Sequence, residues 1–132
     1  MKVTATRRNA QLDNLTAQLN NGYIRIYDGT RPTDADTAVG AQVLLAELRF
    51  GATAFGAASA GTATANAITA DTAANATGTA TWARLLASDG TTAIADISVG
   101  ASGQELNFST ASFVQDVQVS ISSLSLSQPD GA

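Results

Sequence analysis

The segment Tyr23-Ile24-Arg25-Ile26-Tyr27-Asp28-Gly29 alternates apolar and polar side chains and then ends in a turn dipeptide. A period of two places the two isoleucines on one face of an extended chain, and the two tyrosines and the arginine on the other. Asp-Gly is typical of the tight turns that end strands. The segment therefore predicts a β-strand with one buried face.

Short segments with the same alternation recur along the chain. We expect further strands over residues 44–50, 62–69, 78–87, 93–99, 106–108 and 117–126, separated by turns rich in Gly, Asp and Asn. Seven or eight short strands without strand–helix alternation predict an all-β fold, an antiparallel β-sandwich or jelly roll with a short N-terminal helix. A doubly wound nucleotide-binding fold is not favoured.

Two of these strands carry detailed expectations. In residues 44–50 the alternation assigns one face to Leu44, Ala46, Leu48 and Phe50, and the other to Leu45, Glu47 and Arg49. In the last strand the apolar positions change parity at Ser122-Ser123. A bulge there would keep five apolar residues facing inward: Val117, Val119, Ile121, Leu124 and Leu126.

The stretch from Gly56 to Thr81 has low complexity. Every residue in it except Ile68 and Asp71 is Ala, Gly, Thr, Ser or Asn. Such a stretch buries too little apolar area to form a core of its own, so we expect it to be draped over other elements or paired at a sheet edge. This composition favours a surface-covering structural protein.

The N-terminal segment from Arg7 to Asn20 shows helical spacing, with Leu12, Leu15 and Leu19 on one stripe. Thr4 or Thr6 is a suitable N-cap, and Asn20-Asn21-Gly22 predicts a left-handed C-terminal stop. We therefore divide the chain into an arm and helix over residues 1–22 and a single β-sandwich domain over residues 23–132. The leucine stripe either packs on this domain or anchors the subunit to a neighbour.

Composition bounds the functional classes. The chain has 132 residues and a net charge of −4, and its 45% hydrophobic fraction consists largely of alanine. A core this lean predicts limited stability, which association into a dimer or trimer would raise. No apolar segment long enough for a signal peptide or a membrane span occurs, so we expect a protein made in the cytoplasm. The few basic residues do not form the dense patch that nucleic-acid binding requires.

Histidine and cysteine are both absent, which removes the commonest general base, metal ligand and thiol nucleophile. A carboxylate pair is the remaining catalytic option, and Asp34-Ala35-Asp36 is a weak calcium signal without the glycine and glutamate of a calcium loop. The acids lie in predicted turns, where capping of the backbone explains them: Asp28, Asp34, Asp36, Asp71, Asp89 and Asp130. We expect no catalytic residue, metal or cofactor.

Trp82 lies beside Arg84 and is either a core residue or a stacking platform for a ligand ring. The core interpretation is favoured, because this is the only tryptophan of a lean core. A sugar-binding module would need Trp82, Tyr23 or Tyr27 exposed on one face.

Three segments of the chain resemble small virion proteins encoded near the head genes of tailed bacteriophages: Asn21–Gly29, Leu44–Phe50, and Thr77–Arg84 with Asp89-Gly90. The resemblance spans about residues 20–129 and implies a structural role. It implies a capsid cement or decoration protein whose β-sandwich body binds the major capsid protein over capsomer junctions. The acidic balance suits both the outer and the inner face of the capsid, and we favour the outer surface of the virion. It carries over no catalytic residues.

The resemblance leaves other functions open, namely a tail, neck or fibre-associated subunit, a sugar-binding module, or an enzyme. The candidate interface residues are taken from the helix and from the polar face of the first strand: Arg7, Arg8, Leu12, Leu15, Leu19, Tyr23, Arg25 and Tyr27.

Overall fold

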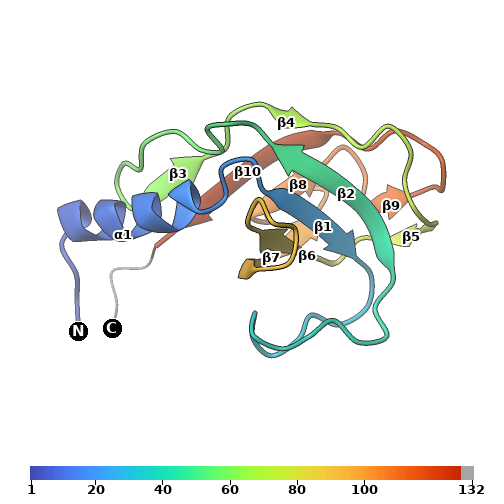
Figure 1. Ribbon diagram of the computed structural model, residues 1–132, viewed down its shortest axis with the longest axis horizontal. Coiled ribbons are helices and arrows are strands. Elements are labelled where there is room, and N and C mark those ends of the chain that lie inside the picture. Colours follow the sequence, from blue (N-terminus) through green and yellow to red (C-terminus); the bar gives the residue numbers. More distant parts are fainter. Residues whose placement is uncertain (129–132) are drawn as a thin grey trace.

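The computed structural model describes residues 1–128, which form one helix and ten strands (Figure 1). The elements are α1 (Ala5–Ala17), β1 (Tyr23–Tyr27), β2 (Leu44–Phe50), β3 (Thr62–Thr64), β4 (Ile68–Thr69), β5 (Gly78–Thr79), β6 (Trp82–Leu86), β7 (Ala93–Gly100), β8 (Leu106–Phe108), β9 (Ser112–Phe113) and β10 (Ile121–Ser127). The predicted fold class, mostly β with a short N-terminal helix, is confirmed. The strands outnumber the prediction because the segments 62–69 and 78–87 each divide into two strands, and because β9 was not expected.

Eight strands form one mixed sheet in the order β3-β10-β8-β7-β6-β1-β2-β4, and β5 pairs with β9. The expectation of a fully antiparallel arrangement is wrong at one pair, because β7 and β8 run parallel. Val99 at the end of β7 is paired with Leu106 at the start of β8. The intervening residues 101–105 therefore carry the chain to the adjacent strand position in the sheet without reversing its direction.

The low-complexity stretch closes this sheet. Its strands β3 and β4 lie at opposite ends of the strand order, yet only residues 65–67 join them. Eight strands in a flat sheet would hold these ends about 34 Å apart, whereas the connection spans about 13 Å when fully extended. The sheet is therefore curled, and residues 62–69 form its seam. The expectation that this stretch pairs at a sheet edge is confirmed.

A backbone bridge near the seam adds to the closure. Asp71 and Val119 exchange two hydrogen bonds, with N···O distances of 3.0 and 2.7 Å. This antiparallel bridge joins the chain just after β4 to the chain just before β10. Both ends of the sheet are thus connected by main-chain contacts from the same alanine- and threonine-rich segment.

Helix α1 packs against the same body. Thr4 caps it by accepting a hydrogen bond from the N–H of Arg7 at 3.3 Å, so the helix begins two residues earlier than expected. The helix ends at Ala17 with Gln18 in the right-handed region as its C-cap, so it stops earlier than predicted, and the left-handed residue Asn21, with a φ of 59°, follows after a further turn. Leu12 and Leu19 are buried in the core that the strands share. The alternative in which the helix packs on its own domain is therefore the observed one.

The side chains of the helical segment also hold the chain that leads into β3. Asn9 Oδ1 accepts from the N–H of Gly61 at 2.9 Å, and Asp13 Oδ1 accepts from the N–H of Ala58 at 2.8 Å. These two bonds satisfy backbone donors that have no sheet partner. Figure 1 shows α1 lying alongside β3 at one end of the molecule.

Strand β2 departs from simple alternation. Ala46 pairs with Ile26 and Leu44 pairs with Tyr27, so Leu45 is the extra residue of a bulge. Leu45 was expected on the outer face with Glu47, but its side chain is fully buried. The bulge turns it inward, because two residues of β2 there oppose one position of β1.

Strand β10 contains the predicted bulge, because Ile121 pairs with Phe108 and the next pair begins at Ser123. The inward orientation is confirmed for Val119, Leu124 and Leu126, which are buried. The predicted inward orientation is wrong for Val117, which is 53% exposed. Ile121 is only half-buried. Val117 belongs to a turn closed by its N–H on the carbonyl of Val114 at 3.1 Å, so no strand begins there.

Candidate functional site

The candidate interface residues do not form one surface. Arg7 is exposed, and Arg8, Leu15, Tyr23 and Arg25 are half-buried. The selection of Leu12, Leu19 and Tyr27 as interface residues is wrong for this conformation, because the chain's own core covers all three. Helical and strand periodicity identify a buried face, but they do not say which part of the molecule buries it.

The polar face of β1 belongs to a row of charged side chains across four strands. Arg25 on β1 is paired with Glu47 on β2 and with Arg84 on β6, and Arg84 is paired with Asp96 on β7. The Nε of Arg25 donates to Glu47 Oε2 at 2.6 Å. The Nε and Nη2 of Arg84 donate to the two carboxylate oxygens of Asp96 at 2.7 and 2.9 Å. Each arginine thus has a carboxylate partner on a neighbouring strand.

Burial differs between the two pairs. The Arg25 and Glu47 side chains remain about one-third exposed, at 32% and 35%, whereas those of Arg84 and Asp96 are only 8% and 6% exposed. The hydrogen bond to Asp96 raises the pKa of Arg84 above its ordinary value, which holds the guanidinium charged inside the protein. The buried pair is part of the internal structure, and solvent does not reach it.

Aromatic rings beside this row are also internal. Tyr27 and Trp82 stack with ring centroids 4.7 Å apart, and Trp82 Nε1 donates to the carbonyl of Asp28 at 3.0 Å. Trp82 is 1% exposed, so its assignment to the core is confirmed. Burial raises the pKa of Tyr27. At the other end of β1, Arg49 of the neighbouring strand β2 places its guanidinium 4.1 Å from the ring centroid of Tyr23.

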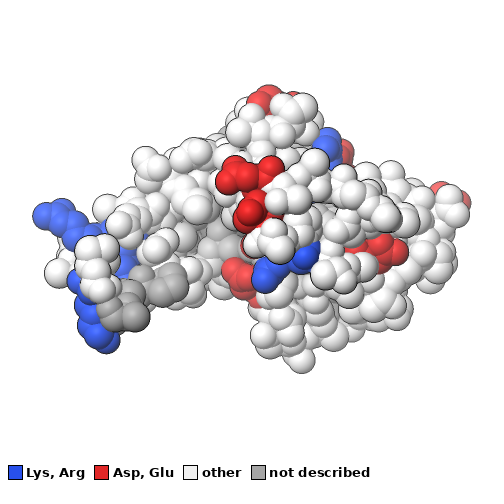
Figure 2. Space-filling view, turned by 90° about the horizontal axis from the view of Figure 1, so that it is seen from below, with Lys and Arg blue, Asp and Glu red and all other residues white. Residues whose placement is uncertain are grey.

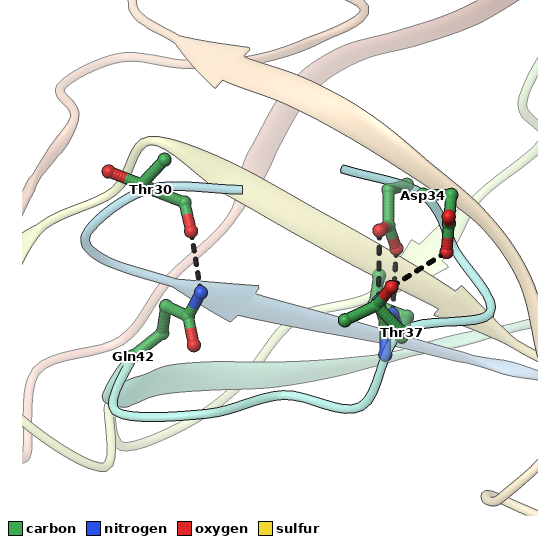
Figure 3. A network of polar contacts seen from close by, with 6 residues as sticks. Thr30, Asp34, Thr37 and Gln42 are labelled. Atoms are coloured by element: carbon green, nitrogen blue, oxygen red, sulfur yellow. Dashed lines mark hydrogen bonds and ion pairs between the residues drawn. The ribbon is translucent and has the colours of Figure 1, made fainter. Parts of the chain in front are cut away.

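The loop over residues 28–43 connects β1 to β2, and Figure 3 shows polar contacts within it. Gln42 Nε2 donates to the carbonyl of Thr30 at 2.5 Å, and the hydroxyl of Thr37 donates to Asp34 Oδ1 at 2.8 Å. Asp28 Oδ1 accepts from the N–H of Val43 at 2.7 Å, which closes the base of the loop. The side chains of Asp28, Asp34, Thr37 and Gln42 thus hold the loop itself.

Other acids have the capping role that their turn positions predicted. Asp71 accepts from the backbone N–H groups of Glu47 and Ala73, and Asp89 accepts from those of Thr91 and Thr92. Within residues 1–128, no three Asp, Glu, His or Cys side chains come close enough to hold a metal ion. In the same range, no helix has the length and apolarity to cross a membrane. Asp130 lies outside the described residues, as does the C-terminal end of the proposed domain.

Residues 52–77 expose mainly small side chains, and we call the exposed residues of this span the small-residue surface. It contains no charged residue and no large apolar residue: Ala52, Thr53, Gly56, Ala57, Ser59, Ala60, Thr62, Thr64, Asn66, Ala67, Thr69, Thr72, Ala73, Asn75 and Thr77. The composition of the sequence indicated such a surface, but none of these residues was among the candidate interface residues.

A group of basic side chains lies at one end of the molecule. Lys2, Arg7 and Arg8 all come from the first eight residues, and Figure 2 shows basic atoms covering the end where α1 lies. Acidic atoms on this face are found toward the middle and the opposite end. On this face the α1 end therefore carries basic atoms, whereas the middle carries both basic and acidic atoms.

In comparisons with known proteins, no protein-family model, no curated protein and no solved structure matched the chain.

Proposed function

We propose that the protein is a structural subunit of a tailed-phage head, which binds the lattice of the major capsid protein on its outer surface and stabilises it as cement or decoration. The observation that carries the proposal is the small-residue surface over residues 52–77. The phage resemblance of the sequence supplies the identity of the partner.

Small side chains suit a contact that must form many times on a preformed lattice. Ala, Gly, Ser and Thr lose little side-chain freedom when they are covered, so ordering them costs little entropy. They also allow the partner's main chain to approach closely. None of the fully exposed residues of this span is charged, and the half-buried Asp71 already accepts hydrogen bonds from the N–H groups of Glu47 and Ala73. A contact here therefore covers few charged atoms.

The same surface is held rigidly before any partner arrives. Ser59 and Thr62 exchange two backbone hydrogen bonds of 2.9 and 3.0 Å, which close a hairpin beside β3. Asn9 and Asp13 brace this hairpin from α1, and the bridge between Asp71 and Val119 holds the far side of the seam. A preorganised surface loses less conformational entropy on docking than a flexible loop does.

The basic end at α1 supports the same proposal in a second way. A positive end on a chain of net charge −4 orients the subunit as it approaches a surface, because complementary charge selects one docking direction. Arg7 is exposed at this end. Binding is therefore expected to weaken as the salt concentration rises.

The experiment measures binding to empty shells assembled from the major capsid protein of the same phage. In Ala57→Gln and Ala67→Gln, a longer neutral side chain is placed on the small-residue surface, and both sites are exposed. The matched control is Ala101→Gln, at an exposed position in the loop between β7 and β8. We expect each surface variant to pellet with shells at least about tenfold more weakly than the control.

If all three variants pelleted equally with the shells, the small-residue surface would not be part of the contact. A wild-type chain that does not pellet with the shells would contradict the capsid proposal itself and favour a tail, neck or fibre subunit. Trp82 fluorescence checks that each variant is folded, since this side chain is buried in the native protein.

A further inference from the structure

Strand β7 is paired on both sides over only part of its length. It pairs with β6 from Ala93 to Ser98, but with β8 only at Val99 and Gly100. The isolated backbone bridges of the described residues do not involve β7. The side of residues 93–97 that faces away from β6 is therefore a free sheet edge in the middle of the strand order, and we call it the open edge of β7.

At Asp96 the main chain is directed toward this open edge. The N–H of Val99 donates to the carbonyl of Thr81, just before β6, at 3.3 Å. Successive residues of a strand direct their N–H and C=O groups to opposite sides. The groups of Ile97 therefore face β6, as those of Val99 do, and the groups of Asp96 face outward.

Solvent reaches this part of the main chain. The side chain of Asp96 is only 6% exposed because it is paired with Arg84, yet the residue as a whole is half-buried. The exposed area of Asp96 thus lies mainly in its backbone. An outward N–H and C=O on a sheet edge are the groups to which a further β-strand binds.

We propose that an extended segment of the major capsid protein, carrying basic residues, adds to the sheet as a strand along the open edge of β7. This inference rests on the proposed function, because it takes the capsid protein as the partner. It adds to that function a main-chain contact made by residues that do not belong to the small-residue surface.

The open edge is long enough for such a strand and is held in place before it arrives. Residues 93–97 span about 17 Å, which is a common length for a strand in a globular protein. On its other side this stretch is paired with β6, and the ion pair between Arg84 and Asp96 joins the same two strands. A preformed edge loses little conformational entropy when an extended segment pairs with it.

The charge around the open edge selects the sign of the incoming segment. The exposed Glu105 lies at one end of the edge, where its carboxylate accepts from the N–H of Ser98 at 3.3 Å. The exposed Asp89 lies in the turn that leads into β7. Among residues 1–128 neither acid is in an ion pair, whereas Asp96 is neutralised by Arg84. Basic side chains on the incoming segment would complement these two acids.

A second copy of the chain fits the open edge less well. Antiparallel pairing of two such edges would bring Asp89 of each copy toward Glu105 of the other, and like charges that face each other across a strand pair are destabilising. The sequence has no basic residue after Arg84 that could offset them. The charge at the edge therefore favours a partner with a different sequence.

The first test is hydrogen–deuterium exchange of the full chain, free and bound to empty shells of the major capsid protein. Mass spectrometry reads the exchange on peptides that contain residues 93–97. We expect the outward amides, such as that of Asp96, to exchange at least about tenfold more slowly in the bound chain, because a hydrogen-bonded amide is protected. The amide of Ile97 faces β6 and should change little.

The second test blocks the open edge with Ala93→Pro. The N–H of Ala87 donates to the carbonyl of Thr92 at 2.9 Å, so the groups of Thr92 face β6 and the N–H of Ala93 faces outward. Proline is tolerated at the first position of a strand, and here it removes an outward donor. We expect Ala93→Pro to pellet with shells at least about tenfold more weakly than Ala41→Pro, the control at an exposed position outside β7. Unchanged Trp82 emission shows that both variants are folded.

The third test removes one charge from the edge. Glu105→Gln keeps an oxygen that can accept from the N–H of Ser98, but it is neutral. We expect its pelleting with shells to weaken about threefold, as suits a single exposed charge. Unchanged pelleting of Glu105→Gln would overturn the basic character of the incoming segment.

The outcomes separate this inference from the proposed function. If the wild type pelleted with shells but residues 93–97 exchanged no more slowly, the strand contact would be overturned and the capsid proposal would stand. Equal pelleting of Ala93→Pro and Ala41→Pro would have the same meaning. A wild-type chain that does not pellet would overturn both proposals. Protection of residues 93–97 in the free chain that grows with its concentration would make a second copy the occupant and would also overturn the inference.

Discussion

Arg84 and Asp96 form a bidentate ion pair between the neighbouring strands β6 and β7, and both side chains are less than a tenth exposed. Taking two charges out of water is costly, so such a pair contributes little net stability compared with apolar residues of similar shape. Removing one partner, however, leaves an uncompensated charge inside the protein. The pair therefore makes the β6–β7 region sensitive to single substitutions.

Asp96→Asn should lower the free energy of unfolding by about 3 kcal/mol, because it leaves the Arg84 guanidinium buried without its carboxylate. The double variant Arg84→Met with Asp96→Leu should lie within about 1 kcal/mol of the wild type. Urea denaturation followed by Trp82 fluorescence measures both. A double variant as unstable as the single one would show that the pair itself holds the strands.

Gly22 is required for close packing between the end of α1 and β6. A Cβ at this position would lie 2.2 Å from the carbonyl oxygen of Leu86 and 2.7 Å from that of Leu19. Gly22→Ala should therefore destabilise the protein by more than about 2 kcal/mol, because two backbone segments must shift. Gly56→Ala is the control, since its Cβ would meet nothing closer than 3.8 Å. If thermal melts gave the same decrease in melting temperature for Gly22→Ala and Gly56→Ala, this explanation would be refuted.

Ala60 is a strained residue on the small-residue surface. Its φ is 51°, and with Gly61 at 76° it forms the two-residue turn between Ser59 and Thr62. Both central residues of such a turn have positive φ, and Asn-Gly is the preferred pair. Ala60→Asn should raise stability by about 1 kcal/mol and increase the melting temperature. Ala57→Asn, at an exposed position without positive φ, should not.

Asp89 makes stability depend on pH in the acid range. The Thr92 hydroxyl donates to Oδ2, and the N–H groups of Thr92 and Thr91 donate to Oδ1, which together hold the pKa of Asp89 well below its ordinary value. The folded state therefore binds a proton less readily than the unfolded state. The stabilising contribution is complete above about pH 4 and falls as the pH is lowered from there.

Asp89→Asn removes this titration, so its stability should fall less steeply than that of the wild type between about pH 4 and pH 2. Urea denaturation at a series of pH values gives the two slopes. Parallel slopes would mean that the turn at residues 89–92 is not the source of this acid sensitivity.

Local signals in the sequence predicted much of the fold. The strand at Tyr23–Tyr27, the left-handed conformation of Asn21 and the bulge near Ser122 depend on neighbouring residues, and each occurs as expected. The edge position of the alanine- and threonine-rich stretch was predictable because small side chains bury too little area to form an interior strand. These features require no knowledge of distant contacts.

The remaining features depend on partners that are distant in the sequence. Leu45 turns inward because β2 pairs with β1 through a bulge, and the parallel β7–β8 pair arises from the sideways step at residues 101–105. The same dependence on distant contacts explains why some candidate interface residues are buried instead. Leu12, Leu19 and Tyr27 have the pattern of contact residues, but the chain itself supplies the contact. Only the composition of residues 56–81 pointed to the surface that the structure exposes.

The stoichiometry of binding to a capsid lattice tests whether this chain is a capsid subunit. Wild-type protein is titrated onto empty shells of the major capsid protein, and the bound amount is measured after sedimentation. We expect saturation at a fixed whole-number ratio of subunits per capsomer, as repeated identical sites require. Binding that never saturates, or no binding at any concentration below about 1 mM, would contradict it.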